Sequence, residues 1–185
     1  MNATDILSNE HRAIKIVLDA MEKVANRLEA DQEVDLSIAD SCLEFATGFA
    51  DKCHHAKEEE LLFPLLEERG VAREGGPIGV MLHEHDEGRN LIKSIKDHLT
   101  RVSAGDKSAR SALAESLKGY ATLLRSHITK EDEVLFVVAS GILSDEDNER
   151  LIKGFDDIEE KKIGPGVHEE YHKMLDALAE RIKNL

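Results

Sequence analysis

The sequence predicts an all-α protein, in which four long core helices are followed by one or two shorter helices. Three observations predict this class. Apolar residues recur at alternating steps of three and four, which is the spacing of one helix face. Proline occurs at only three positions and tryptophan is absent, and hydrophobic residues make up 41% and charged residues 34% of the chain. That balance favours helices over sheets, and 185 residues suit a single domain.

The first two helices are expected over about residues 4–30 and 36–69. The first has an inward face that contains one histidine, formed by Leu7, His11, Ile14, Leu18, Met21, Ala25 and Leu28. The second has an inward face that contains a histidine and a glutamate, formed by Leu43, Thr47, Ala50, His54, Glu58, Leu61 and Leu65. Gly70 is a suitable C-terminal stop, and Pro64 should kink the last turn or shift its hydrogen bonding.

The third helix is expected over about residues 77–102, with Pro77 as its first residue. Its inward face again contains one histidine, and is formed by Ile78, Met81 or Leu82, His85, Gly88, Ile92, Ile95 and Leu99. A break at 103–106 precedes the fourth helix. Its inward face contains a histidine and a glutamate, and is formed by Leu113, Leu117, Tyr120, Leu124, His127, Glu131, Val134 and Val138.

Two shorter helices are expected after this core, which spans about residues 5–140. Ser144 and Asp147 have the spacing of a capping box and predict a helix that runs to about residue 162. The last helix, about 167–184, is amphipathic and should pack on the bundle. We therefore expect one domain with a C-terminal helical extension over about 144–184.

The charge of the chain limits its partners. A formal charge of −14 repels nucleic acid and anionic lipid, so neither DNA, RNA nor a membrane surface is expected as a partner. No apolar run is long enough for a membrane span, and residues 1–10 lack the pattern of a secretory signal, so a cytoplasmic location is predicted. Cys42 and Cys53 do not form a metal-binding or redox motif, and we expect reduced, buried thiols.

An internal repeat carries the chemistry. Residues 54–63, His-His-Ala-Lys-Glu-Glu-Glu-Leu-Leu-Phe, match residues 127–136, His-Ile-Thr-Lys-Glu-Asp-Glu-Val-Leu-Phe. In each segment a histidine and a glutamate four residues apart lie on one helix face. A buried carboxylate costs several kcal/mol unless it is paired or coordinated, and no inward-facing Lys or Arg was found on these faces. A divalent metal is the natural compensation.

The ligand types indicate which metal. Histidines on four core faces, His11, His54, His85 and His127, are joined by Glu58 and Glu131. A single histidine on an apolar face is more often a hydrogen-bonded core residue, but this combination is hard to explain by chance. Imidazole and carboxylate ligands suit iron, manganese or zinc, and two glutamates able to bridge suit a pair of irons best.

These residues resemble the ligand pattern of the hemerythrin-like, HHE cation-binding family. Glu10-His11, the Leu-Leu-Phe-Pro run at 61–64 and the segment at 84–89 strengthen the resemblance, which covers about residues 5–140. It implies an up-and-down four-helix bundle that holds two iron ions joined by an oxo or hydroxo bridge. His11 and His54 would bind one iron, His85 and His127 the other, and Glu58 and Glu131 would bridge them. Glu10 and Asp86 are candidates to hold the outer nitrogens of the histidines.

The sequence departs from the family pattern at one place. Oxygen-carrying hemerythrins have a second histidine one turn before the third-helix ligand, where this chain has Met81. One metal is therefore short of a nitrogen, and His55 is the preferred replacement. The alternative is that His55 is a partly exposed neighbour of the site and not a ligand. The carriers also use an Asp five residues after the fourth-helix histidine, here Asp132, whereas the internal repeat favours Glu131.

The remaining histidines rank lower as ligands. His83 should face away from the core, because it lies two residues from His85. His168 and His172 are four residues apart and are candidates for accessory ligands, but no carboxylate of the repeat supports them. His98 ranks below both.

The resemblance implies a protein that binds or senses dioxygen, peroxide or nitric oxide, or that handles iron. Met81 weakens the case for reversible oxygen carriage and favours sensing, iron handling or detoxification. The alternatives are a di-iron redox enzyme acting on peroxide or nitric oxide, and a structural or regulatory bundle tied by metal. No substrate motif was found, so binding is favoured over catalysis.

Overall fold

The computed structural model describes residues 2–183 and 185. Met1 and Asn184, the predicted end of the last helix, lie outside the described residues. The described part of the chain contains helices and turns but no strand, which confirms the all-α class. The first three long helical segments are α1 (Ala3–Glu29), a column made of α2 (Ser37–Phe45), η1 (Ala46–His55), η2 (Glu58–Leu62) and α3 (Phe63–Glu68), and α4 (Pro77–Ser103).

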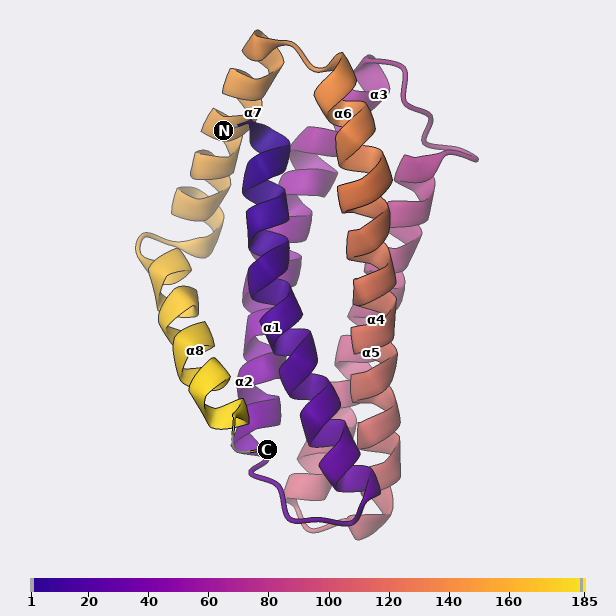
Figure 1. Ribbon diagram of the computed structural model, residues 1–185, viewed down its shortest axis with the longest axis vertical. Coiled ribbons are helices and arrows are strands. Elements are labelled where there is room, and N and C mark those ends of the chain that lie inside the picture. Colours follow the sequence, from indigo (N-terminus) through magenta and orange to yellow (C-terminus); the bar gives the residue numbers. More distant parts are fainter. Residues whose placement is uncertain (1, 184) are drawn as a thin grey trace.

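The second half of the chain completes the core and adds a layer. A short turn, η3 (Lys107–Ala109), leads into a fourth column made of α5 (Arg110–Lys130), η4 (Glu131–Leu135) and α6 (Phe136–Ile142). The extension consists of α7 (Asp145–Ile158), η5 (Glu159–Ile163) and α8 (Val167–Ile182). In Figure 1 the extension runs beside α1 and α2, on the side away from α4 and α5.

The four long segments lie side by side. α5 packs against both α1 and α4, and the α2 column packs against α1 and α4. This arrangement is consistent with an up-and-down four-helix bundle. α8 packs on α1 and α2, and η5 packs on η1, so the extension covers the α2 column in the middle of its length. None of the described helices has the length and apolar character that a membrane span requires.

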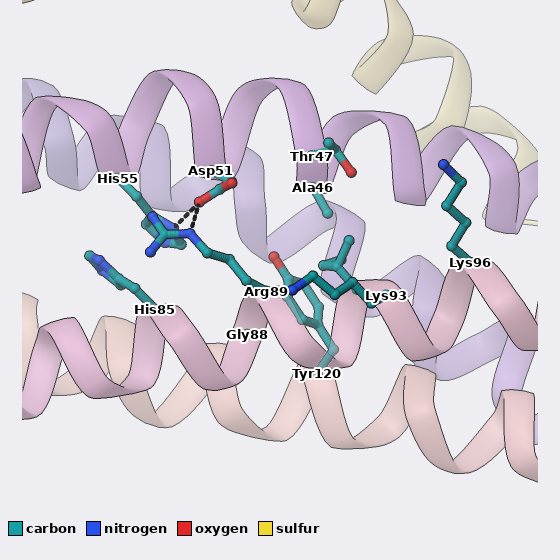
Figure 2. A pocket seen from close by; sticks show the side chains of 11 residues that line it. Ala46, Thr47, Asp51, His55, His85, Gly88, Arg89, Lys93, Lys96 and Tyr120 are labelled. Atoms are coloured by element: carbon teal, nitrogen blue, oxygen red, sulfur yellow. Dashed lines mark hydrogen bonds and ion pairs between the residues drawn. The ribbon is translucent and has the colours of Figure 1, made fainter.

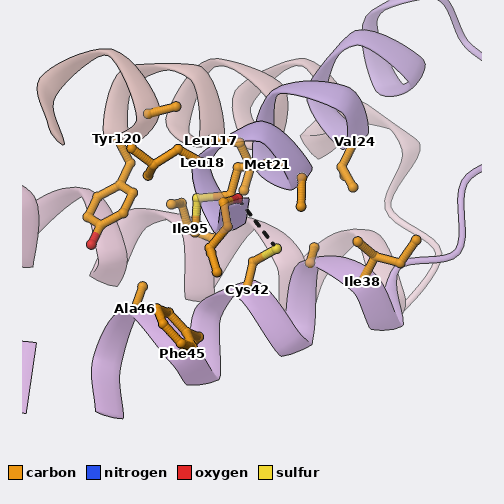
Figure 3. Packing of buried hydrophobic residues seen from close by; sticks show 14 of the residues in the cluster. Leu18, Met21, Val24, Ile38, Cys42, Phe45, Ala46, Ile95, Leu117 and Tyr120 are labelled. Atoms are coloured by element: carbon orange, nitrogen blue, oxygen red, sulfur yellow. Dashed lines mark hydrogen bonds between the residues drawn. The ribbon is translucent and has the colours of Figure 1, made fainter. Parts of the chain in front are cut away.

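Sequence signals at the helix ends are confirmed. Ser144 and Asp147 form the predicted capping box, and α4 begins at Pro77. Gly70 has a φ of +91° just after α3, a conformation that favours glycine and ends the helix. Both cysteines are free and buried, as predicted. In Figure 3, Cys42 lies among the apolar side chains of α1, α2, α4 and α5.

The apolar core is divided into two clusters by a polar layer. The larger cluster contains residues such as Leu18 and Leu117, and the smaller one contains Leu7 and Leu135. Along α1, Leu7 belongs to the smaller cluster and Ile14 to the larger one. His11 lies between them and is fully buried. The other columns also pass from the smaller cluster through the polar layer to the larger cluster. The histidines of the internal repeat therefore lie in the interior, with apolar side chains above and below them.

Part of the predicted inward face of the second and fourth helices is wrong. Val134 and Val138 are 53% and 42% exposed, whereas Leu135 and Ala139 are 1% and 0% exposed. The same shift makes Leu62 fully buried and leaves Leu61 only partly buried. The cause is a π-helical turn in each repeat, over Glu58–Leu62 and Glu131–Leu135. A π-turn holds one extra residue, so every later position rotates by about one place relative to an α-helix.

This shift predicts a contrast between neighbouring residues. Leu135→Ala removes a fully packed side chain and should lower the free energy of unfolding by about 2–5 kcal/mol. Val134→Ala, one position earlier, should change it by less than about 0.5 kcal/mol. Chemical denaturation of the two variants measures the difference. Equal losses would contradict the rotation that the π-turn introduces.

Candidate metal centre

The two repeated segments begin their π-turns at the predicted bridging glutamates. The N–H of Phe63 donates to the carbonyl of Glu58, and the N–H of Phe136 donates to that of Glu131. π-turns inside helices are frequently found at functional sites. Here each turn lets the preceding His-x-x-x-Glu pair face the polar layer while the following Leu-Phe pair faces the smaller apolar cluster.

The predicted ligands all meet in this polar layer. The six side chains of the repeat and its partner helices are at most 1% exposed: His11, His54, Glu58, His85, His127 and Glu131. His55 is also buried, at 4%. They come from α1, the α2 column, α4 and the α5 column, so four segments that are distant in sequence contribute to one site.

Within the layer the side chains form two groups. The first group is His11, His54, Glu58 and Glu131, and the second is His55, Glu58, His85 and His127. In each group the potential ligand atoms lie within 4.8 Å of one another. The Nε2 atoms of His11 and His54 are 3.1 Å apart, as are those of His85 and His127. Two nitrogens bound to one ion at about 2.1 Å, with an angle near 95°, would have about this separation.

The two glutamates span both groups. Glu58 places one oxygen 3.5 Å from Nε2 of His54 and the other 3.4 Å from Nε2 of His85. Glu131 reaches both groups through a single oxygen, Oε2, which lies 3.2 Å from Nε2 of His11 and 3.3 Å from Nε2 of His127. Both carboxylates therefore lie between the two groups, Glu58 through two oxygens and Glu131 through one.

The residues fit a bound cation pair on a second ground. All four carboxylate oxygens of Glu58 and Glu131 are buried without a hydrogen-bond partner, and so are both ring nitrogens of His55. Buried polar atoms are normally satisfied, because an unpaired one costs about 1–3 kcal/mol, and more when charged. Bound divalent ions would satisfy the four carboxylate oxygens and one ring nitrogen of His55, while Nδ1 of His55 lies 3.6 Å from Asp51.

Carboxylates outside the layer hold the other nitrogen of each histidine. Nδ1 lies 2.8 Å from Asp132 in His11 and 2.8 Å from Glu10 in His54. The corresponding distances are 2.6 Å from Glu59 in His85 and 2.9 Å from Glu84 in His127. Such partners fix the proton on Nδ1 and turn the Nε2 lone pair towards a metal.

This outer layer changes two expectations. Asp132 contacts Nδ1 of His11 and not the interior, whereas Glu131 lies inside the site. Asp86 was wrong as a candidate partner, because its side chain is 73% exposed and pairs with Arg89. Glu10 contacts Nδ1 of His54, in agreement with its prediction as a residue that holds an outer histidine nitrogen. Glu59 and Glu84 were missed, although both lie directly beside predicted ligands in the sequence.

The site has an approximate internal two-fold symmetry in which α1 corresponds to α4 and the α2 column to the α5 column. The equivalent pairs make equivalent contacts: Glu10 and Glu84, His11 and His85, Lys15 and Arg89, His54 and His127, Lys57 and Lys130, Glu58 and Glu131, Glu59 and Asp132.

His55 breaks the symmetry, because its counterpart is Ile128. The ring of His55 stacks on His85 with 3.9 Å between centroids. The second group therefore has three imidazoles and the first has two.

Neighbouring carboxylates raise the pKa values of two histidines of the site, His11 and His127. Burial opposes a charge on His11, but its contacts with Asp132 and Glu131 prevail and raise its pKa to about 9. Burial is likewise outweighed at His127, where Glu131 and Glu84 raise the pKa to about 10. The pKa of His55 is held well below its usual value by burial and by the neighbouring His85. His55 is therefore neutral, with a lone pair available.

Lys57 is a buried cation that the sequence interpretation missed. Its side chain is fully buried, and it pairs with Glu10 and with Glu159 of the extension. It does not neutralise Glu58 or Glu131. It completes a chain of contacts that runs from His54 through Glu10 and Lys57 to Glu159, and so connects the site to the extension.

Removal of Lys57 should therefore be costly. In Lys57→Gln, the buried Glu10 loses its lysine partner and keeps the contact with His54, and the free energy of unfolding should fall by about 3–5 kcal/mol. The symmetry-related Lys130 is 37% exposed, and Lys130→Gln should cost less than about 1 kcal/mol. Thermal and urea unfolding of both variants provide the comparison. Equal losses in the two variants would contradict the expectation that burial and the contact with the extension make Lys57 the more important residue.

The remaining histidines lie elsewhere. His83 is 75% exposed, as predicted, and His98 contacts Ser116. His168 and His172 contact each other at 3.0 Å, outside both groups. His168 does lie near Cys53 and Glu159, in a third group of possible ligands. There the ammonium of Lys57 already pairs with Glu159.

Comparison with known proteins also indicates a cation-binding domain. The sequence model of the hemerythrin HHE cation binding domain matches residues 2–139. Uncharacterized protein Rv1995 of Mycobacterium tuberculosis is 25% identical over 185 residues, which is 100% of this chain and 71% of the relative. No solved structure matches the chain significantly.

Shorter matches link the chain to proteins named for iron chemistry. Iron-sulfur cluster repair protein YtfE of Escherichia coli O157:H7 is 33% identical over 85 residues, covering 45% of this chain and 39% of that protein. The YtfE protein of Musicola paradisiaca is 39% identical over 87 residues, covering 45% and 38%. The chain thus spans less than half the length of these two relatives.

Proposed function

The chain belongs to the hemerythrin HHE cation binding family, and on that premise we propose that it is a non-haem di-iron protein that binds or senses a small oxidant such as dioxygen. The observation that carries the proposal is the pair of buried glutamates. Each reaches histidines of both groups, and their four oxygens have no hydrogen-bond partner. Two neighbouring cations that share two carboxylates account for both facts.

The chain's own residues would divide the work. His11 and His54 would hold one iron, and His55, His85 and His127 the other, with Glu58 and Glu131 shared between them. A ferrous pair supplies two one-electron reductants and a coordination position that a small oxidant can occupy. The apolar clusters above and below exclude bulk water. Asp132, Glu10, Glu59 and Glu84 keep the Nδ1 protons in place and fix the rings.

The two groups contain different numbers of imidazoles, and this difference supports binding of the oxidant at one ion in particular. Five imidazoles are shared as two and three, so an ion held by His11 and His54 would have one imidazole fewer than its neighbour. We propose that the oxidant binds there. His11 stacks on Phe136 with 5.5 Å between centroids, so an apolar surface adjoins that ion.

A second candidate is iron handling or repair, and the similarity to iron-sulfur cluster repair proteins favours it. In that role the centre would give up or oxidise iron and would not bind oxygen reversibly. The chain matches only part of those proteins, so this function rests on the shared segment alone.

Exposure of the ferrous protein to air tests the proposal. The full chain is loaded anaerobically with ferrous iron, air is admitted, and the visible spectrum is recorded before and after the gas is removed under argon. We expect a new absorption band that disappears when oxygen is removed. Irreversible oxidation with loss of iron would favour the second candidate. Binding of one zinc per chain without iron uptake would contradict both and indicate a structural metal.

A further inference from the structure

A cavity of about 340 Å³ lies beside the second group of ligands. It runs between η1 and α4, with Tyr120 of α5 at its floor (Figure 2). His55 and His85 lie at one end, and Lys93 and Lys96 lie at the other, as Figure 2 shows. The proposed oxidant site at His11 and His54 does not line this cavity.

The size of the cavity exceeds what a diatomic molecule needs. A water molecule takes up about 30 Å³ of liquid, and pockets for small organic molecules begin near 300 Å³. Ala46, Gly88 and Ile92 give the cavity an apolar wall. The space therefore suits an organic ligand of several heavy atoms.

The charge of the lining selects the kind of ligand. Arg89, Lys93 and Lys96 line the cavity together with one carboxylate, that of Asp51. Arg89 is held by Asp51 at 2.8 Å and by Glu59 at 2.6 Å. Lys93 and Lys96 have no ion-pair partner among the residues that the structure describes. Two free cations beside a cavity, on a chain with a formal charge of −14, make this a local attractor for anions.

A hydrogen-bond donor lies inside the cavity. The side chain of Tyr120 is 3% exposed, and its hydroxyl has no hydrogen-bond partner within the described part of the chain. Burial raises the pKa of Tyr120, so the hydroxyl keeps its proton and can donate to an anion. In Figure 2 the hydroxyl points into the space between η1 and α4.

We propose that this cavity is a binding site for a small organic carboxylate. The carboxylate would accept a hydrogen bond from Tyr120 and be attracted by Lys93 and Lys96, and the apolar part would lie against Ala46 and Ile92. This site goes beyond the proposed function and does not depend on it, since none of these groups is a proposed metal ligand.

Binding of benzoate and butyrate to the full chain tests the proposal, with benzamide and butyramide as neutral analogues. Saturation-transfer NMR and calorimetry are carried out with and without added ferrous iron. We expect at least one carboxylate to bind about tenfold more tightly than its amide, with similar affinity in both metal states. Tyr120→Phe, which removes only the hydroxyl, should weaken binding about tenfold.

A matched pair of double variants isolates the two lysines. Lys93→Gln with Lys96→Gln should weaken carboxylate binding by about tenfold. Lys107→Gln with Lys173→Gln makes the same change in net charge on exposed residues away from the cavity, and should leave binding unchanged. The proposal is overturned if neither carboxylate binds, if acids and amides bind equally, or if the two double variants behave alike. Binding that requires iron would also overturn it, because it would place the anion on the metal.

Discussion

Replacement of Glu58 by alanine is expected to reduce bound iron from two ions per chain to at most one. Glu58 is fully buried and reaches His54 in one group and His85 in the other. Without it, both positions lose a ligand, and a single carboxylate is left to balance two dications. Because the two positions share Glu58, the loss should be cooperative. Iron content after anaerobic loading and desalting gives the stoichiometry.

Two further variants make this result specific. Glu131→Ala should also reduce the bound iron, because Glu131 lies between His11 and His127. Glu60→Ala removes an exposed carboxylate from the same π-turn, and should leave two irons bound. Retention of both irons in Glu58→Ala would remove that residue from the bridge.

Iron binding is expected to tighten steeply as the pH rises from about 6 to 9. In the metal-free protein the pKa of His11 is raised to about 9 and that of His127 to about 10. Both imidazoles are therefore protonated at neutral pH and must lose a proton to bind metal. Burial opposes a charge on His85, but its contacts with Glu58 and Glu59 raise its pKa as well. With at least two protons released, the overall binding constant should rise at least about a hundredfold per pH unit across this range. Calorimetry in buffers of different ionisation enthalpy counts the protons.

The free energy of unfolding of the metal-free protein should fall as the pH rises, whereas the iron affinity should increase. The pKa of each histidine is raised from its usual value of 6.5, to about 9 in His11 and about 10 in His127. Their contribution to the free energy of unfolding is therefore complete below about pH 6.5 and is lost as the pH rises through about 9 to 10. The iron-loaded protein should not show this loss, because metal replaces the protons. Unfolding midpoints measured with and without iron at pH 6.5 and 9.5 compare the two trends. Iron affinity that did not change with pH would show that the imidazoles are already neutral.

Much of the site could be predicted from the sequence because its elements are short-range patterns. A His-x-x-x-Glu pair lies on one helix face whatever the rest of the fold does, and its repetition at residues 54–58 and 127–131 marks two such faces. The inward positions of His11 and His85 follow from the apolar residues three and four places away. The structure brings all of these residues together, and places His55, the predicted replacement ligand, in the same layer.

Other features depend on contacts that a sequence does not display. The π-turns change the inward face after Glu58 and Glu131, and no local composition distinguishes them from an α-helical turn. Lys57 occupies a position that the helical period alone would leave near the surface, and in the structure it contacts Phe155 and Glu159 of the extension. Asp132 follows Glu131 directly, and its contact with Nδ1 of His11 requires the packing of α1 against the α5 column.

Anomalous diffraction from a crystal of the iron-loaded protein, collected at the iron absorption edge, tests the central claim most directly. We expect two iron peaks, one beside His11 and His54 and the other beside His85 and His127, with both carboxylates between them. A single peak, or iron bound instead beside Cys53, Glu159 and His168, would contradict this account.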